Sequence, residues 1–507
     1  MDQDRSTADV PPESRARPKD PTRKLLRQQL FEFSPRQRQG VFDLRSLCPE
    51  DAAELGQFIH QRVTEKDATA SAIALSVQTG FHPNDLSDVW LHGDAQSLPA
   101  LSVCLPTACL IVDLDQAIDP AEEPDRESLS SFEKADRRVR LPLPHFLADE
   151  LRRRHAARPN AQTIGDLLGR VSLNGRLALK RGPGYRLRLT WKRLRRALPL
   201  ICIGLGIHPV VAALLTLDFR LTSKSNFSYL TVKAQMLDEA AFRLFAHLGW
   251  GEPCVLGDRP PAGSLTTLTR PAVTQHFAAL EGRLRDLHPG RHATTETLLA
   301  FHNAYVDFCA TFLWFVGLSR QTSELDFSAA LLAAGAWFTP YDDKATGPTG
   351  LPRALLISEA AQAQIRFHAN HCAALLGRLK RQGTSVPRSL VTQLSGVAEG
   401  RNVPLLASID PTSREPQAVG TASILSAPGA KHWPCDAGRH YFLSRYFELG
   451  MSDALLDIAA RHATAGTEHM SSTSRMSMWA AHQQINAFQM AELARLDLLP
   501  LPGLSRR

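Results

Sequence analysis

The stretch LLAFHNAYVDFCATFLWFVGLSR, residues 298–320, places apolar side chains at three- and four-residue spacing as far as Phe315 and then reaches Gly317. That spacing predicts a helix with a broad buried face, and the glycine predicts its end. The same helical spacing occurs in residues 52–77, 147–154 and 451–460, whereas the short apolar stretches 102–112, 138–143 and 354–357 are strand candidates. We therefore expect a mainly α fold with small β-sheets, one in each half of the chain.

The length of 507 residues implies more than one large domain, because single cores stop growing near roughly 250–300 residues. Residues 1–38 are rich in Pro, Arg, Asp and Ser, which is typical of a disordered arm. Residues 251–292 mix Pro, Gly and charge, which favours a connection between two halves. The expected organisation is an arm (1–38), a first domain (39–250), a linker (251–292), a second domain (293–485) and a tail (486–507).

Cysteine usage and hydropathy bear on the cellular compartment. No two of the eight cysteines have CxxC spacing, which argues against a zinc site or a disulfide framework and favours a reducing compartment. The N-terminus lacks a charged start followed by an apolar segment, so secretion is not indicated. The apolar stretch 198–217 contains His208-Pro209 and two glycines, which predicts two buried helices meeting at a turn rather than a membrane span. We expect a cytoplasmic protein.

Positive charge is modest overall and concentrated locally. The formal net charge is +7 and the pI is near 9.1, which permits a nucleic-acid partner without establishing one. Basic residues crowd around Trp191: Arg186, Lys192, Arg193, Arg195 and Arg196. Such a segment is either a phosphate-contacting surface or an ordinary solvated face.

Residues suited to phosphate chemistry follow one another in the second half. Cutting and joining DNA needs cations for the charge on the phosphate oxygens and an acid for the leaving oxygen. Arg320 follows the apolar helix, Lys344 lies in the turn after Asp342-Asp343, and Arg353 begins a strand that leads into a helix. Further on stand Asp436-Ala-Gly-Arg439-His440 and, beyond Gly450, His462.

This order resembles the catalytic domain of the tyrosine recombinases, the family of the phage integrases. The resemblance implies that Arg320, Lys344, Arg439 and His462 bind the phosphate and act as acid or base, and that Arg353 and His440 contact DNA. The family's histidine-x-x-arginine box begins here with Asp436 instead of histidine. The family's nucleophilic tyrosine is expected about nine residues past the late histidine, where Ser471 stands, and no tyrosine follows Tyr446.

The first half shows a similar layout with different gaps. His82 occupies the place of the first arginine, and Lys134 precedes a strand and a helix. The stretch Trp191–Arg196 resembles the second-arginine box, with Lys192 where histidine is usual and Arg195 as the arginine. Tyr229 lies eleven residues past Asp218, close to where the family places its nucleophile, although a packed aromatic at a helix end is an equally good interpretation. The resemblance implies two recombinase-like folds in tandem, each incomplete.

The implied function is a site-specific recombinase of a mobile element that cuts and rejoins double-stranded DNA through a phosphotyrosine link. Tyr229 would attack, Arg195 with Arg320 or Arg439 would hold the phosphate, and Lys344 or His462 would protonate the leaving oxygen. Lys134 and the basic residues around Trp191 would contact DNA. Such chemistry needs no metal and no cofactor, and the family assembles as oligomers on DNA. The alternatives are a non-catalytic DNA-binding accessory subunit of a recombinase complex and a helical scaffold unrelated to DNA.

Overall fold

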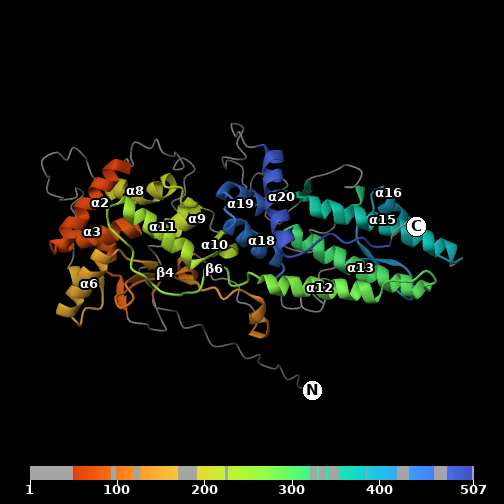
Figure 1. The fold of residues 1–507 in the computed structure, drawn as a ribbon, viewed down its shortest axis with the longest axis horizontal. Helices are drawn as coiled ribbons and strands as arrows, with labels where there is room; N and C mark the ends of the chain where they lie inside the picture. The colour runs from red at the N-terminus through yellow and green to blue at the C-terminus, as the bar shows by residue number, and fades with distance from the viewer. Residues whose placement is uncertain are drawn as a thin grey trace, which may run out of the picture.

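The structure of the chain is a computed structural model, and it is mainly helical with small sheets, as the sequence predicts. It describes residues 49–92, 99–118, 126–169, 191–222, 226–319, 328–330, 338–341, 353–383, 385–419, 433–461 and 477–504. The described part is elongated, with the N-terminal helices at one end and α12, α13, α15 and α16 at the other (Figure 1). Helices α18, α19 and α20 lie between these two ends.

The N-terminal lobe packs helices against a four-stranded sheet. The sheet has the order β1-β2-β3-β4, with β1 and β2 parallel and the other neighbours antiparallel. The bounds are α2 (Pro49–Thr64), α3 (Ala68–Thr79), α4 (Pro83–Leu86), β1 (Trp90–His92), β2 (Leu101–Cys104), β3 (Cys109–Asp113), α5 (Leu114–Ala117), β4 (Arg138–Pro142), α6 (His145–Ala157) and α7 (Ile164–Leu168). The candidate strand 102–112 is thus a pair of strands joined by a tight turn.

The apolar stretch 198–217 forms two helices that meet at a turn, which confirms the prediction. The bounds of this part are α8 (Trp191–Gly204), α9 (Pro209–Thr216), α10 (Asn226–Tyr229), β5 (Thr231–Val232) and α11 (Ala234–His247). His208 ends the turn, because its Nδ1 accepts a hydrogen bond from the backbone N–H of Val210 at 3.2 Å and so caps α9.

The expectation of a linker at residues 251–292 is wrong. This segment contains β6 (Ala262–Gly263), which pairs with β5, and α12 (Arg270–Asp286). Val273, Phe277, Leu280 and Leu284 recur at helical spacing along α12 and are buried. The Pro- and Gly-rich composition of the segment comes from the loop before α12 and conceals that apolar face.

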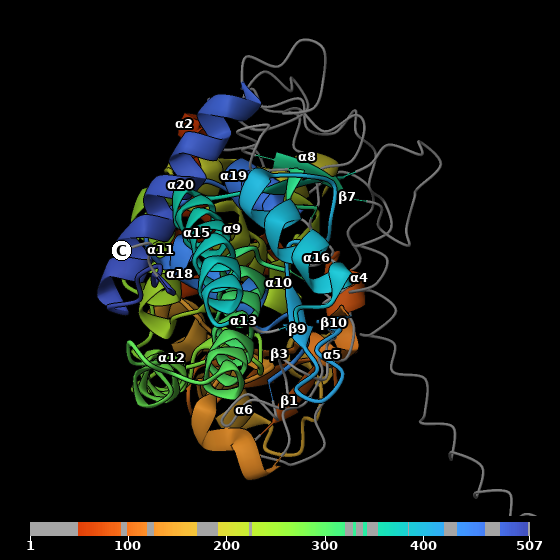
Figure 2. The same ribbon diagram turned by 90° about the vertical axis from the view of Figure 1, so that its right-hand side faces the viewer.

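The second lobe is built around α13 (Thr295–Val316), whose side chains are almost all buried. The other bounds are β7 (Phe338–Tyr341), β8 (Arg353–Leu356), α15 (Glu359–Arg381), α16 (Arg388–Glu399), β9 (Ala407–Ile409), β10 (Pro416–Ala418), α18 (Ala437–Glu448), α19 (Asp453–Ala459) and α20 (Met478–Arg495). Helices α13, α15 and α16 lie side by side in both views (Figures 1 and 2). Among the described helices α13 is long and apolar enough to cross a membrane, but 83% of its apolar window is buried inside the protein.

The expected tail at 486–507 is also wrong, since α20 runs to Arg495 and its end is packed into the fold. Glu492, Leu493, Leu498 and Leu504 are all buried. One continuous hydrophobic cluster runs from Ala52 to Leu504 and includes the residues of α12. The described part of the chain therefore does not divide at 251–292 into two domains with separate cores.

Candidate active site at the junction of the lobes

The candidate residues differ in how far the structure describes them. Arg186, Arg320, Lys344 and His462 lie outside the described residues, as does Ser471. The structure describes the side chains of Lys134, Tyr229, Arg439 and His440, whereas for Lys192, Arg193, Arg195 and Arg196 in α8, and for Arg353 at the start of β8, it describes the backbone. The expected convergence of Arg320, Lys344, Arg439 and His462 is therefore described at one of its four members.

Tyr229 and Arg439, which are 210 positions apart in the sequence, lie together where the two lobes meet. The guanidinium carbon of Arg439 lies 5.2 Å from the centroid of the Tyr229 ring. That distance is within the range of a cation–π contact. The side chain of Arg439 is completely buried, and Tyr229 is half-buried.

His440 is the third member of this group. Its ring lies edge-on to Tyr229, with the ring centroids 4.8 Å apart. Its Nδ1 is 2.8 Å from Ser264 Oγ and 3.1 Å from Thr266 Oγ1, and its Nε2 is 3.3 Å from Asp436 Oδ1. Both ring nitrogens are thus engaged, and the imidazole is held in one orientation.

Asp436, which stands at the histidine position of the family's box, supplies negative charge to the group. Burial acts to raise the pKa of this carboxyl, but the hydrogen bond and charge of His440 together with the charge of Arg439 hold the pKa below its ordinary value. The carboxylate therefore stays ionised and stabilises the two cationic partners on its own helix turn.

Local backbone geometry explains how these side chains meet. Ser444 on α18 accepts a hydrogen bond from the backbone N–H of Thr231 and donates one to the carbonyl of Tyr229, each at 3.1 Å. Arg137 donates to the carbonyl of Phe227 at 2.9 Å. On the other side of α18, a Cβ placed on Gly438 would lie 2.3 Å from the carbonyl oxygen of Phe315, so glycine is what lets α18 approach α13.

A second location of interest lies where α13 and α19 end. Arg461, of which 6% is exposed, donates from Nη2 to the carbonyl of Leu318 at 2.6 Å. Both residues have a left-handed backbone, with φ of 57° for Arg461 and 52° for Leu318. Such strain in non-glycine residues collects at functional sites. In the sequence, Arg320 comes two residues after Leu318 and His462 directly follows Arg461.

A small pocket of about 30 Å³ lies against this junction and is lined by Ser358, Arg461, His482 and Asn486 among others. His482 lies 3.0 Å from the carbonyl of Ile357 through Nε2, and Asn486 accepts from the N–H of Glu359 at 2.9 Å. These bonds tie α20 to the segment between β8, which begins at the candidate residue Arg353, and α15.

The candidate residues of the first half have more ordinary surroundings. His82 caps α4, with Nδ1 accepting from the N–H of Asn84 at 3.2 Å. Lys134 is exposed in the loop before β4. These placements favour structural and surface roles, and neither residue has a printed contact with Tyr229.

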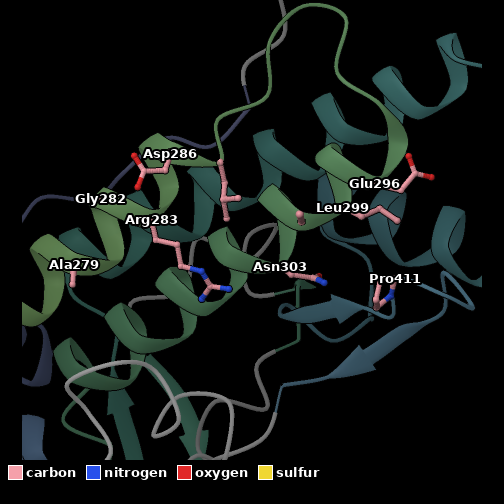
Figure 3. A pocket seen from close by; sticks show the side chains of 10 residues that line it. Ala279, Gly282, Arg283, Asp286, Glu296, Leu299, Asn303 and Pro411 are labelled. Atoms are coloured by element: carbon pink, nitrogen blue, oxygen red, sulfur yellow. The ribbon is translucent and has the colours of Figure 1, made fainter.

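The largest hollow in the described surface lies elsewhere, between α12 and α13 beside the turn that precedes β10. Figure 3 shows this groove of about 790 Å³, with Gly282 and Arg283 on one side and Leu299 and Asn303 on the other. Arg283 is bound to Asp307 at 3.1 Å, and both amide atoms of Asn303 bond to the backbone of Ile409. None of the described candidate residues lines the groove, and its polar side chains already have structural partners.

Sequence reasoning missed the hydroxyl groups that hold the site. Ser264, Thr266 and Ser444 come from segments with no motif, and their roles depend on packing between distant parts of the chain. The pairing of Asp436 with His440 had a sequence signal, since residues four apart on a helix face one another.

Within the described ranges, no group of three or more His, Cys, Asp or Glu side chains is arranged to hold a metal ion. The described cysteines carry free thiols. Comparison with known proteins finds no matching family model, no matching curated protein and no matching solved structure.

Proposed function

We propose that the chain is a recombinase-like protein that binds double-stranded DNA and breaks and rejoins it through Tyr229. The observation that carries the proposal is the packing of Tyr229 against Arg439 and His440. These residues were selected from the order of motifs in two different halves of the sequence, and an accidental resemblance gives no reason for them to meet.

The proposed reaction needs a nucleophile, a cation and an acid. The Tyr229 hydroxyl loses its proton and attacks phosphorus, the bond to the 5′-oxygen breaks, and the leaving oxygen takes up a proton. Arg439 stabilises the charge on the non-bridging oxygens. The resulting 3′-phosphotyrosine preserves the energy of the broken bond, so that attack by a 5′-hydroxyl rejoins the strand and releases the tyrosine.

The test is capture of a covalent protein–DNA adduct on a nicked suicide substrate, from which the cut fragment diffuses away. Wild-type protein should form the adduct, and Tyr229→Phe should abolish it while leaving DNA binding intact, because the phenyl ring keeps the packing and lacks the attacking oxygen. Ser471→Ala is the matched control, and adduct formation should change little. An adduct that survives Tyr229→Phe and disappears with Ser471→Ala would move the nucleophile to the second half.

A specific observation favours a second candidate, the non-catalytic DNA-binding accessory. Arg439 is completely buried, and a guanidinium in that state does not touch a phosphate. An accessory protein would bind DNA with an affinity that falls steeply with salt and would give no adduct on any substrate. The absence of both salt-dependent binding and adduct would leave the helical scaffold.

A further inference from the structure

Of the two side chains at the junction of the lobes, Tyr229 is the one that reaches solvent. Tyr229 is half-buried, Arg439 is fully buried, and the guanidinium carbon lies 5.2 Å from the ring centroid. The edge of His440 closes one side of the same ring. The phenol ring therefore covers the arginine.

The cover is held by few bonds, and they come from opposite lobes. Ser444 on α18 binds the carbonyl of Tyr229 and the N–H of Thr231, on either side of Leu230. One turn of helix, α10, carries the tyrosine, and its first residue, Asn226, reaches the hydroxyl of Thr222 at 2.8 Å. A segment this short can move without unfolding a long helix.

The charge beneath the ring is that of an anion site already balanced from within. Asp436 lies one helical turn before His440 and keeps its negative charge, because His440 and Arg439 lower the pKa of its carboxyl against the effect of burial. Closed, the site satisfies its cations with Asp436 and the tyrosine ring. Open, it would present a guanidinium with nearby hydroxyls to an incoming phosphate oxygen.

We propose that Tyr229 is a removable cover on a phosphate site built around Arg439, and that a DNA phosphodiester enters only when the segment 226–230 swings away from α18. The proposal rests on the proposed function and adds its regulation: the closed state protects both the nucleophile and the phosphate-binding arginine until DNA is bound.

The test is the reactivity of Arg439 toward phenylglyoxal, read by mass spectrometry on the full chain. In wild-type protein and in Tyr229→Phe, Arg439 should be labelled slowly, because both keep an aromatic ring over the guanidinium. In Tyr229→Ala the rate should rise by at least about tenfold, the factor expected for loss of a desolvated cation–π contact. Arg445 is the internal control, since it lies 5.2 Å from the Tyr441 ring, is buried, and should stay slow in all three proteins.

Ser444→Ala provides a second route to the same state, because it removes the hydroxyl that holds the segment and leaves the ring in place. It should also speed labelling of Arg439, and it guards against misfolding of Tyr229→Ala. Equal labelling of Arg439 in wild type and in both folded variants overturns the proposal. The proposed function fails on a different result: adduct formation depends on the tyrosine oxygen, which Tyr229→Phe removes, whereas the cover depends on the ring, which Tyr229→Phe keeps.

Discussion

At the scale of single residues, the site depends on two neighbours on α18 with opposite demands. Gly438 must have no side chain, since the Phe315 backbone occupies the place of its Cβ. Arg439 must have a long one, because its guanidinium reaches the Tyr229 ring while the residue has no exposed surface. The close approach of α18 to α13 and the burial of Arg439 are therefore parts of one arrangement.

Gly438→Ala tests this close approach. The new Cβ would lie 2.3 Å from the Phe315 carbonyl oxygen and 2.9 Å from its Cα, which are backbone atoms that cannot rotate away. We expect a loss of about 1–3 kcal/mol in the free energy of unfolding measured in urea, the usual effect of overpacking. Gly282→Ala on α12 is the matched control, because nothing lies within 4 Å of its Cβ. There alanine should be neutral or should stabilise by up to about 1 kcal/mol through its better helix propensity. Equal effects of the two substitutions would contradict the packing described.

At the scale of elements, the sequence predicts the helices better than their partners. The apolar spacing from Leu298 predicts a helix that the structure places at Thr295–Val316, with Thr294 capping its N-terminus. It does not predict α12, whose apolar face follows a loop rich in Pro and Gly. Nor does spacing predict that α10 meets α18, because that contact joins residues more than 200 positions apart and depends on packing of the whole chain.

A buried group of three histidines ties four elements of the second lobe together. His302 on α13 donates from Nε2 to the carbonyl of Ala407 in β9, and its Nδ1 accepts from His371 Nε2 on α15, each at 3.0 Å. His371 Nδ1 in turn accepts from the N–H of Leu504, near the end of the described chain. His368 donates to the carbonyl of Leu405. Every nitrogen with a fixed role is used by the neutral rings, so an added proton would have to displace one of these bonds.

This group should make stability fall in acid. Burial lowers the pKa of His302 to about 4 and that of His368 to about 3 in the folded protein, whereas the unfolded value is about 6.5. The stabilisation is complete above pH 6.5 and is lost as the pH falls toward the folded pKa, because the unfolded chain then binds protons that the folded chain refuses. Each group contributes a slope of up to about 1.4 kcal/mol per pH unit.

His302→Gln keeps a donor for the Ala407 carbonyl and removes one titrating ring, so urea unfolding between pH 7.5 and 5 should show a shallower loss of stability than in wild type. His292→Gln, at an exposed histidine, should leave the profile unchanged. A profile for His302→Gln that parallels wild type would mean that this ring is already protonated or is not buried in solution.

At the scale of the whole molecule, the two lobes are joined by a shared polar junction as well as by a continuous core. Arg445 on α18, of which 4% is exposed, binds Glu133 from the loop before β4 and Glu448 on its own helix. Lys233, which precedes α11, binds Glu448 at 3.2 Å. Composition predicts two domains of the right approximate size, but it contains no information on the interface that fuses them, and the candidate site lies at that interface.

Arg445→Met should therefore destabilise both lobes together. Methionine matches the aliphatic part of arginine and removes its charge, which leaves Glu133 and Glu448 without their buried partner. We expect a loss of about 3–5 kcal/mol in the free energy of unfolding, the usual cost of breaking a buried ion pair from one side, within a single transition seen by both circular dichroism and tryptophan fluorescence. Adding Glu448→Gln should restore part of that loss, because it removes one of the stranded charges. Arg62→Met is the control, since Arg62 pairs with Glu65 on the surface and its loss should change little. If Arg445→Met instead separates unfolding into two transitions with one unchanged from wild type, the lobes fold independently, and the junction that brings Tyr229 to Arg439 is a docking contact between two domains rather than part of a common core.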